Sequence, residues 1–300
     1  MADKRALITG TSTGIGRAAV TAFLERGWHV LAGLRDAEGR SSLFAADAER
    51  FGDRLELLEL DMTSVRDRDH ARARVEAGGG LDCLINNAGY GLFGALENLS
   101  EAQIRAQFEV NTFGAILLTQ AMLPALRRRR GSLLNVSSVF GEVGFPLAGA
   151  YCGSKYALEG FTEALRLELA PHGVRVGLLE PGNHRTSFGE NLAWGERDEP
   201  AYAAQNRAYQ QFRRRLSRRP SSGGPAPVVR ALCRLAEAEK VPLRTRIGRD
   251  VRSVALLRAL LPESVFVAAY GAMARRVMGD KSSLDPAEGE TPRRSAAEER

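Results

Sequence analysis

Cysteine and histidine are scarce in this 300-residue chain. The three cysteines, Cys83, Cys152 and Cys233, are odd in number and widely spaced, and the four histidines show no ligand spacing. Neither a disulfide framework nor a metal site can be built from such a set. We therefore expect no bound metal and a reducing compartment, the cytoplasm.

Long apolar runs are also missing. Even residues 251–270 are interrupted by Arg252, Arg258 and Pro262, so no segment is long and apolar enough to span a bilayer. The polar residues 1–5 lead directly into an apolar segment, without the regions of a signal peptide. We expect a protein that is neither secreted nor anchored by a transmembrane segment.

Aromatic residues are few as well, at 7%, and none is interleaved with the arginine runs at residues 127–130 and 213–219. A nucleic-acid-binding surface normally combines such charge with a recognisable motif. The net charge of +6 therefore indicates solvated helix ends and loops, or a basic cleft that attracts a phosphorylated ligand, and no nucleic-acid partner.

What the sequence does contain is an alternation of short β-like runs and helical segments. Several runs are mostly apolar, such as residues 81–85, which suits strands covered by helices on both faces. The alternation predicts an α/β fold, a Rossmann-type doubly wound parallel sheet with a C-terminal helical extension. The expected strands are residues 5–9, 29–33, 55–60, 81–86, 132–137 and 175–179.

The first expected strand ends in a glycine-rich turn. Gly10, Gly14 and Gly16 follow the pattern G-x-x-x-G-x-G and precede a helix-like segment. Glycines allow a tight turn and a close backbone approach, and the free N–H groups at a helix N-terminus attract a pyrophosphate. An ordinary strand-to-helix connection would also use glycine, but the position after the first strand of a β-α-β unit favours a nucleotide site.

Tyr151 and Lys155 form a second candidate element. Residues four apart on a helix share a face, so the Lys155 ammonium can lie near the Tyr151 phenol. A nearby positive charge stabilises the phenolate and lowers the phenol's ordinary pKa of about 10, which suits acid–base catalysis near neutral pH. An amphipathic helix with a packed tyrosine and a solvated lysine would give the same spacing.

Further motifs accompany these two elements in a fixed order along the chain. With them, the sequence resembles the short-chain dehydrogenase/reductase family over residues 4–188. A Y-x-x-x-K pair alone occurs by chance in many helices, whereas six concordant motifs are specific. The additional motifs are the N-N-A-G segment at residues 86–89, Asn111, Ser138 and the Pro-Gly pair at residues 181–182.

The resemblance implies a catalytic set of Asn111, Ser138, Tyr151 and Lys155. Ser138 would orient the substrate oxygen and Tyr151 would exchange its proton, so both would contact the substrate. Lys155 would also hold the nicotinamide ribose, and Asn111 would keep a water linked to Lys155. From the residues alone, Asn111 could equally kink or pack a helix, and Ser138 could cap a turn.

The resemblance also implies cofactor contacts from several segments. Asn87 to Gly89 could stabilise the central sheet as readily as bind the cofactor, and Asp61 could serve as a cap at a strand end. Asn183 and His184 depart from the apolar residue that the family usually carries there. The implied contacts are Gly10, Ser12, Gly14, Ile15, Gly16, Arg35, Asp61, Met62, Asn87, Ala88, Gly89, Tyr151, Lys155, Pro181, Gly182 and Thr186.

Leu34 and Arg35 bear on the choice of cofactor. By resemblance, Leu34 stands at the strand-end position where NAD-dependent relatives carry an acid, and Arg35 follows where NADP-dependent relatives carry a base. A guanidinium can pair with the 2′-phosphate of NADP, with Ser12 as an added donor. Asp36 lies about where an acid would bind the ribose of NAD, but it could instead cap the next helix. We expect a preference for NADP(H) without absolute exclusion of NAD(H).

The sequence pattern loosens in the last third of the chain. We predict one domain in which residues 1–190 form the dinucleotide-binding and catalytic core. Residues 191–279 would form a substrate lid and C-terminal helices, with Pro262 separating two of them. Residues 280–300 are charged and poor in apolar side chains, so we expect a disordered tail.

Residues 32–36, 151–169 and 181–188 resemble the 17-beta-hydroxysteroid and retinol dehydrogenase branch of the family. The branch implies an oxidoreductase that interconverts a ketone or aldehyde and an alcohol, on a bulky apolar, steroid- or retinoid-like substrate. Its C-terminal helices cover the substrate cleft. The apolar face of residues 251–278 could do so here, or could simply pack against the core.

Two other functions fit parts of the sequence: a non-catalytic NADP(H)-binding sensor on the same fold, and a basic surface-binding protein. The intact catalytic set argues against the sensor, and the glycine turn argues against the surface-binding protein. The family usually forms dimers or tetramers through helices that correspond to residues 101–127 and 151–170. We therefore expect a homodimer or homotetramer, although burial within one chain would explain the same apolar stripes.

Overall fold

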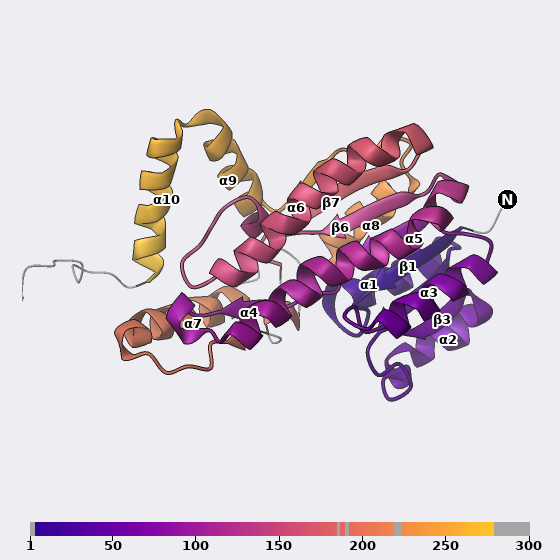
Figure 1. The fold of residues 1–300 in the computed structure, drawn as a ribbon, viewed down its shortest axis with the longest axis horizontal. Helices are drawn as coiled ribbons and strands as arrows, with labels where there is room; N and C mark the ends of the chain where they lie inside the picture. Colours follow the sequence, from indigo (N-terminus) through magenta and orange to yellow (C-terminus); the bar gives the residue numbers. More distant parts are fainter. Residues whose placement is uncertain (1–3, 185–186, 190–191, 219–223, 279–300) are drawn as a thin grey trace, which may run out of the picture.

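The alternating segments form one parallel sheet in the computed structural model, which describes residues 4–184, 187–189, 192–218 and 224–278 (Figure 1). In this part of the chain the strand order is β3-β2-β1-β4-β6-β7-β9. The order runs outward from β1 in both directions, so the sheet is doubly wound as predicted. The strands are β1 (Arg5–Thr9), β2 (His29–Leu34), β3 (Leu55–Glu59), β4 (Cys83–Asn86), β6 (Ser132–Val136), β7 (Arg175–Pro181) and β9 (Arg244–Ile247).

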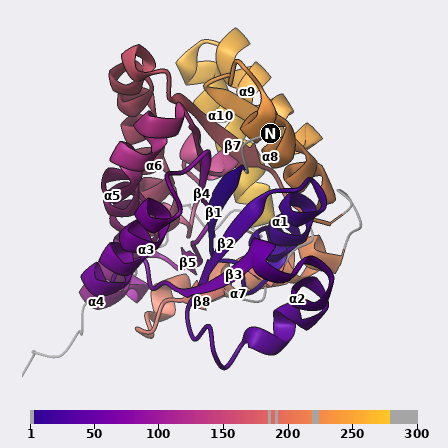
Figure 2. The same cartoon turned by 90° about the vertical axis from the view of Figure 1, so that its right-hand side faces the viewer.

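Helices cover both faces of this sheet (Figure 2). One apolar core lies between the sheet and α1 with α8, and a second lies between the sheet and α3, α5 and α6. Neighbouring residues of β1 alternate between them, with Ile8 in the first core and Leu7 in the second. The helices are α1 (Gly14–Glu25), α2 (Ala45–Phe51), α3 (Val65–Ala77), α4 (Glu101–Phe108), α5 (Ala115–Arg129), α6 (Gly149–Leu169), α7 (Ala203–Arg218), α8 (Ala226–Glu237), α9 (Arg249–Leu260) and α10 (Glu263–Val277).

The elements agree closely with the sequence pattern, with one omission in the main sheet. All six expected strands form, and each end lies within two residues of the expected one. Pro262 separates α9 from α10, as predicted. Strand β9 is not predicted, because Arg244 and Arg246 alternate with Thr245 and Ile247 and leave only one large apolar residue. It pairs with β7 at the edge of the sheet.

A second, small sheet lies beyond the carboxyl edge of the first. Strands β5 (Gly91–Phe93) and β8 (Leu192–Trp194) pair in parallel, with Leu92 opposite Ala193. This pairing ties the chain after the N-N-A-G segment to the chain that leads into α7. Residues after 190 thus contribute α8 and β9 to the core as well as elements around the cavity described below. The predicted division at residue 190 stays a prediction, and the tail at 280–300 lies outside the described residues.

Among the residues described, no helix combines the length and apolar character needed to cross a membrane.

Candidate active site

The predicted site residues gather at one edge of the sheet because four neighbouring strands end there. In the parallel register, Ile8 of β1 lies opposite Ile85 of β4, and Val136 of β6 lies opposite Leu179 of β7. The glycine turn, the N-N-A-G segment, Ser138 and the Pro-Gly pair therefore follow adjacent strand ends. This carboxyl edge, where the strand order reverses, is the usual ligand site of an open α/β sheet.

The glycine turn is packed too tightly for side chains. Gly10 has φ of +68°, and a Cβ there would lie 2.7 Å from the Cα of Ala88. A Cβ on Gly16 would lie 2.2 Å from the carbonyl oxygen of Gly10. Thr13, which precedes α1, makes no side-chain capping bond. The first N–H groups of α1 therefore face the turn without a side-chain cap, as an anion site requires.

Asn87 stabilises this turn through its side chain. Its Nδ2 donates to the carbonyl oxygens of Thr9 at 2.9 Å and Gly10 at 3.2 Å. The hydroxyl of Thr9 in turn accepts from the backbone N–H groups of Asn87 and Ala88, each at 3.0 Å. Residues 87–89 could either stabilise the sheet or bind the cofactor, and these contacts show that they stabilise the turn and the strand ends.

Arg35 lies where a cofactor-selecting base is expected. Strand β2 ends at the buried Leu34, and the exposed Arg35 follows directly. Asp61, which follows β3, lies close enough to Arg35 for the arginine's charge to affect the pKa of its carboxyl group. Partial burial would raise the pKa of Asp61, but hydrogen bonds from Thr63 and the charges of Arg35 and Arg68 lower it below its ordinary value. Arg35 and Asp61 thus flank the same corner of the carboxyl edge.

Neither nearby aspartate caps a helix, contrary to the alternatives drawn from the sequence. Asp36 has φ of +57° and accepts from the backbone N–H of Gly39 at 3.1 Å, which closes a turn. Asp61 accepts from the backbone N–H of Thr63 at 2.8 Å. The cap of α3 is Ser64. Both aspartates use the short-range turn bonding typical of their side chain.

The other predicted cofactor contacts differ in burial and in their distance from the cavity. Ser12 is partly buried in the glycine turn, and Ile15 lines the cavity described below. Met62 is buried in the core against the π-helical segment, since a Cβ on Gly114 would lie 2.7 Å from its Cβ. Thr186 lies outside the described residues.

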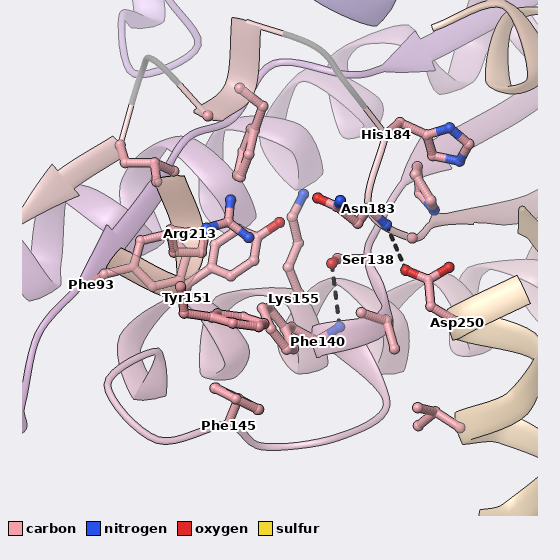
Figure 3. A pocket seen from close by; sticks show the side chains of 18 of the residues that line it. Phe93, Ser138, Phe140, Phe145, Tyr151, Lys155, Asn183, His184, Arg213 and Asp250 are labelled. Atoms are coloured by element: carbon pink, nitrogen blue, oxygen red, sulfur yellow. Dashed lines mark hydrogen bonds between the residues drawn. The ribbon is translucent and has the colours of Figure 1, made fainter. Parts of the chain in front are cut away.

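Three of the four predicted catalytic residues line one cavity of about 1020 Å³ (Figure 3). Tyr151 and Lys155 project from the first turns of α6, and Ser138 follows β6. The Nζ of Lys155 donates to the carbonyl oxygen of Val136 at 2.8 Å. Figure 3 shows Lys155 between Tyr151 and Ser138, so a single ligand could contact all three.

Burial dominates the acid–base properties of the pair. It raises the pKa of Tyr151 to about 12, although the Ser138 hydroxyl and the Arg213 charge oppose the rise. It lowers the pKa of Lys155 to about 8, against the influence of Glu159 one turn along α6. The sequence predicts a lowered phenol pKa. The opposite direction results from the aromatic side chains that exclude water around Tyr151.

Ser138 and Asn111 also make the structural contacts considered from the sequence. The Ser138 hydroxyl accepts from the backbone N–H of Phe140 at 3.3 Å and so caps a turn. Asn111 lies in a π-helical segment, Glu109–Gly114, between α4 and α5. Its Nδ2 donates to the Tyr90 carbonyl oxygen at 2.9 Å, and its Oδ1 accepts from the Tyr90 N–H at 3.0 Å. A catalytic role for either residue stays a prediction.

Aromatic side chains form most of the remaining wall. The ring centroids of Phe93 and Tyr151 are 5.8 Å apart, and those of Phe145 and Tyr209 are 5.7 Å apart. Leu257 of α9 and several residues of α10 complete the wall, so the C-terminal helices do line the cavity. No motif in the sequence identifies this lining. We refer to it as the aromatic wall: Phe93, Phe140, Phe145, Phe188, Trp194, Tyr209, Phe212 and Tyr270.

Asp250 positions the segment after β7, a role without a sequence signal other than an acid in the first turn of α9. Its Oδ2 accepts from the backbone N–H of Asn183 at 2.7 Å. A Cβ on Gly182 would lie 2.1 Å from Asp250 Oδ1, so the carboxylate packs directly against this glycine. His184 Nε2 lies 3.0 Å from the Ile247 carbonyl oxygen. Of the two departures from the family pattern, His184 contacts β9 through its ring, whereas Asn183 contacts α9 through its backbone N–H.

A cluster of charged side chains joins buried glutamates to two partly exposed arginines of β9. Arg244 Nε is 3.0 Å from Glu159 Oε2 and 3.2 Å from Glu180 Oε1, and Arg246 Nε is 3.1 Å from Glu180 Oε2. Arg246 also pairs with Glu142, in the loop that follows Ser138. Burial and the nearby Glu159 and Glu142 raise the pKa of Glu180 to about 8, despite the two arginines.

Comparisons with known proteins agree with this geometry. A family model described as short chain dehydrogenase matches residues 4–196. The uncharacterized oxidoreductase YusZ of Bacillus subtilis (strain 168) is 34% identical over 274 residues, which cover 89% of this chain and 96% of that protein. The 3-ketodihydrosphingosine reductase of Bacteroides thetaiotaomicron is 33% identical, with 86% and 93% covered. Human retinol dehydrogenase 8 is 38% identical over 62% of this chain and 61% of its own length, which confirms the predicted resemblance to that branch.

Solved structures share the fold. A short-chain dehydrogenase from Streptomyces avermitilis is similar with a TM-score of 0.76 at 33% identity, covering 91% of this chain and 99% of that one. A short chain dehydrogenase from Burkholderia cenocepacia J2315 in complex with NADP has a TM-score of 0.69 at 27% identity, with 89% and 97% covered. This chain therefore belongs to the short-chain dehydrogenase family and is an oxidoreductase.

Proposed function

We propose that the protein is an NADP(H)-dependent oxidoreductase that interconverts a ketone or aldehyde and an alcohol on a bulky apolar substrate. The observation that carries the proposal is the placement of Ser138, Tyr151 and Lys155 in one aromatic-walled cavity that extends to the carboxyl edge of the sheet. Relatives named for retinol and for 3-ketodihydrosphingosine support a long apolar substrate.

Several features along the carboxyl edge support an NADP(H) site. The crowding around Gly10 and Gly16 leaves backbone at the surface of the turn, where a pyrophosphate can approach the N-terminus of α1. Arg35 is exposed and would pair with the 2′-phosphate of NADP. Pro181 and Gly182 would adjoin the nicotinamide, and Lys155 would hold its ribose. The NADP in the Burkholderia structure supports the same class of cofactor.

The chain's own residues then orient the carbonyl group and move a proton. Bound nicotinamide supplies the hydride in reduction and accepts it in oxidation. Tyr151 is protonated at neutral pH, because its pKa lies near 12, and donates its proton to the carbonyl oxygen that Ser138 orients. Lys155, with a pKa near 8, can return a proton to Tyr151. Asn111 would keep the water that connects Lys155 with solvent.

The test is turnover of NADPH, followed by its absorbance, with a panel of long-chain aldehydes and ketones and with NADH in parallel. We expect turnover of apolar carbonyl compounds and a higher kcat/KM with NADPH. Tight NADPH binding without turnover of any carbonyl compound would favour the sensor. A preference for NADH would contradict the assignment of Arg35.

We also propose a cytoplasmic homodimer or homotetramer. Large apolar side chains on the helices expected to assemble are exposed in the single chain, with 45% exposure for Phe113, 46% for Phe161 and 76% for Leu167. Such side chains gain free energy when a second subunit covers them. Light scattering after gel filtration at micromolar concentration measures the mass, and a strictly monomeric mass would contradict this proposal.

A further inference from the structure

Helix α7 places two polar side chains against the aromatic wall. Tyr209 and Arg213 are one helical turn apart and so share a face of α7, and both line the cavity. Tyr209 is only 1% exposed. Its hydroxyl oxygen and the Nε of Arg213 are buried, and neither atom has a hydrogen-bond partner among the residues that the structure describes.

The surroundings of this pair are apolar. The guanidinium carbon of Arg213 lies 5.4 Å from the ring centroid of Phe93, and the Tyr209 ring lies 5.6 Å from the same ring. Arg213 is partly buried, and a cation over an aromatic face replaces only part of the hydration that such a side chain loses. Buried polar groups in folded proteins are nearly always bonded. The pair is therefore arranged for a ligand group that accepts hydrogen bonds.

The pair lies next to the reacting position. The positive charge of Arg213 influences both phenols, because it opposes the rise in the pKa of Tyr151 and of Tyr209. Figure 3 shows the Arg213 guanidinium beside the Tyr151 ring. Of the other charged side chains that line the cavity, Lys155 donates to Val136, Asp250 accepts from the segment after β7, and Arg214 follows Arg213 at an exposed position of α7. Arg213 thus remains available to a substrate held by Tyr151.

We propose that Tyr209 and Arg213 bind a carboxylate of the substrate, so that the preferred substrates are apolar oxo acids and the corresponding hydroxy acids. This inference rests on the proposed function and narrows its substrate class. A carboxylate accepts from a guanidinium and a phenol with its two oxygens. A phosphate monoester carries about two negative charges and three acceptor oxygens, more than Arg213 and Tyr209 alone can satisfy. Because the exposed Arg214 also lines the cavity, binding of a phosphate is one outcome of the test.

Turnover of matched substrates tests the carboxylate site. The probes are oxo acids of increasing chain length and their methyl esters, which have the same reacting carbonyl group. In the wild type we expect kcat/KM for the best acid to exceed that of its ester by at least about tenfold, mainly through KM, since a hydrogen bond to a charged group contributes about 1.5–3 kcal/mol. Arg213→Met should bring this ratio close to one, and Tyr209→Phe should lower it less. Arg207→Met, an exposed arginine on the same helix, should leave the ratio unchanged.

Two outcomes would overturn the proposal. One is equal efficiency for acid and ester in the wild type. The other is an Arg213→Met variant that loses the same factor on both substrates and shifts the pH profile, since Arg213 would then act on Tyr151 rather than on the substrate.

Binding without turnover separates this proposal from the proposed function. Calorimetry with decanoate, decanol and decyl phosphate needs no reaction. Decanoate should bind the wild type at least about tenfold more tightly than decanol does and should lose this advantage in Arg213→Met. If decanoate behaves this way while no carbonyl compound is reduced, the subsite stands and the proposed function fails. Equal binding of decanoate and decanol, or tighter binding of decyl phosphate, would refute the carboxylate site.

Discussion

The cavity has a cofactor side made mainly of backbone and a substrate side made mainly of aromatic side chains. The cofactor side consists of the glycine turn at residues 10–16 and the N-N-A-G segment, where backbone packs against backbone. The aromatic wall consists of large side chains from β5, residues 140–145, residue 188, β8, α7 and α10. On the cofactor side, a methyl group added to Gly10 or Gly16 would collide with main-chain atoms. In the aromatic wall, single rings such as Phe93 contact several other rings.

This difference explains why the sequence reveals one side and not the other. Where a Cβ would lie within 3 Å of the backbone, only glycine fits. The glycines must therefore occur at fixed spacings, and such spacings can be recognised in the sequence. An aromatic wall can be built from rings at many positions, and its residues need no fixed spacing. We therefore expect substitutions on the cofactor side and at the catalytic group to act strongly, and those in the supporting structure to act weakly.

The largest effect is expected at Tyr151, the point where the two sides meet. Tyr151→Phe keeps the ring that packs against Phe93 but removes the hydroxyl. Turnover should fall by about 10²–10⁴-fold, the usual contribution of an acid–base group, with NADPH affinity nearly unchanged. Steady-state kinetics and NADPH fluorescence titration measure the two effects. Near-normal turnover in this variant would contradict the mechanism.

Gly16→Ala tests the backbone packing of the cofactor side. The new Cβ would lie 2.2 Å from the Gly10 carbonyl oxygen, so the turn must shift at an expected loss of about 1–3 kcal/mol in cofactor binding or folding. Gly160→Ala is the matched control, because a Cβ on this exposed residue of α6 has no heavy atom within 4 Å. The control should bind NADPH normally and stabilise the helix slightly. If Gly16→Ala matched the control in both NADPH affinity and melting temperature, the contrast between the two sides would be removed.

Arg35 sharpens the comparison within the cofactor side, because here a side chain rather than backbone is expected to act. Arg35→Ala should lower kcat/KM for NADPH by about 10–150-fold relative to NADH, since it removes charge-assisted bonds to the 2′-phosphate. Leu34→Asp should shift the preference further toward NADH. Arg72→Ala on α3 is an exposed control that should leave the ratio unchanged. The NADP assignment is wrong if the ratio of the two efficiencies does not move in Arg35→Ala.

The smallest expected effect concerns the cluster of charged side chains around Glu180. The carboxyl of Glu180 titrates near pH 8 in the folded protein and near its ordinary value of 4.5 in the unfolded chain. Between these values the folded state holds the additional proton, so stability is greatest at the acidic end and declines as the pH rises toward 8. Glu180→Gln removes this ionisation and should flatten the decline.

Melting temperatures of wild type and Glu180→Gln between pH 5.5 and pH 8.5 measure the decline, at about 2–4 °C for each kcal/mol. Parallel curves for the two proteins would show that Glu180 does not titrate in this range.

Most of the fold follows from local sequence signals, and the exceptions have physical causes. Strands β1 and β4 are buried on both faces, so their apolar runs identify them. Strand β9 lies at the sheet edge, where Arg244 and Arg246 reach the buried glutamates, so its pattern shows charge instead of apolar alternation. β5 and β8 are three residues each and exist only because they pair with each other.

The candidate site divides in the same way. Ser138, Tyr151 and Lys155 could be named because their order along the chain, together with the other motifs, resembles that of the family. Arg213 and Asp250 could not, because each acts through the tertiary position of its helix. The direction of the pKa shift of Tyr151 could not be predicted from the sequence either. Residues distant along the chain, such as Phe93, create the apolar surroundings that raise this pKa.

The π-helical segment Glu109–Gly114 has a consequence for the permitted length of the chain. It joins α4 and α5 into one continuous rod, in which one additional residue rotates everything beyond it by about 100°. Both ends of the rod contact α6, but α4 also contacts β5, whereas α5 contacts α3 and β4. Loops elsewhere can gain or lose residues at small cost, but deletion of a single residue here would turn Asn111 away from Tyr90. The contact between Asn111 and Tyr90 therefore depends on the number of residues in this stretch, and not only on its composition.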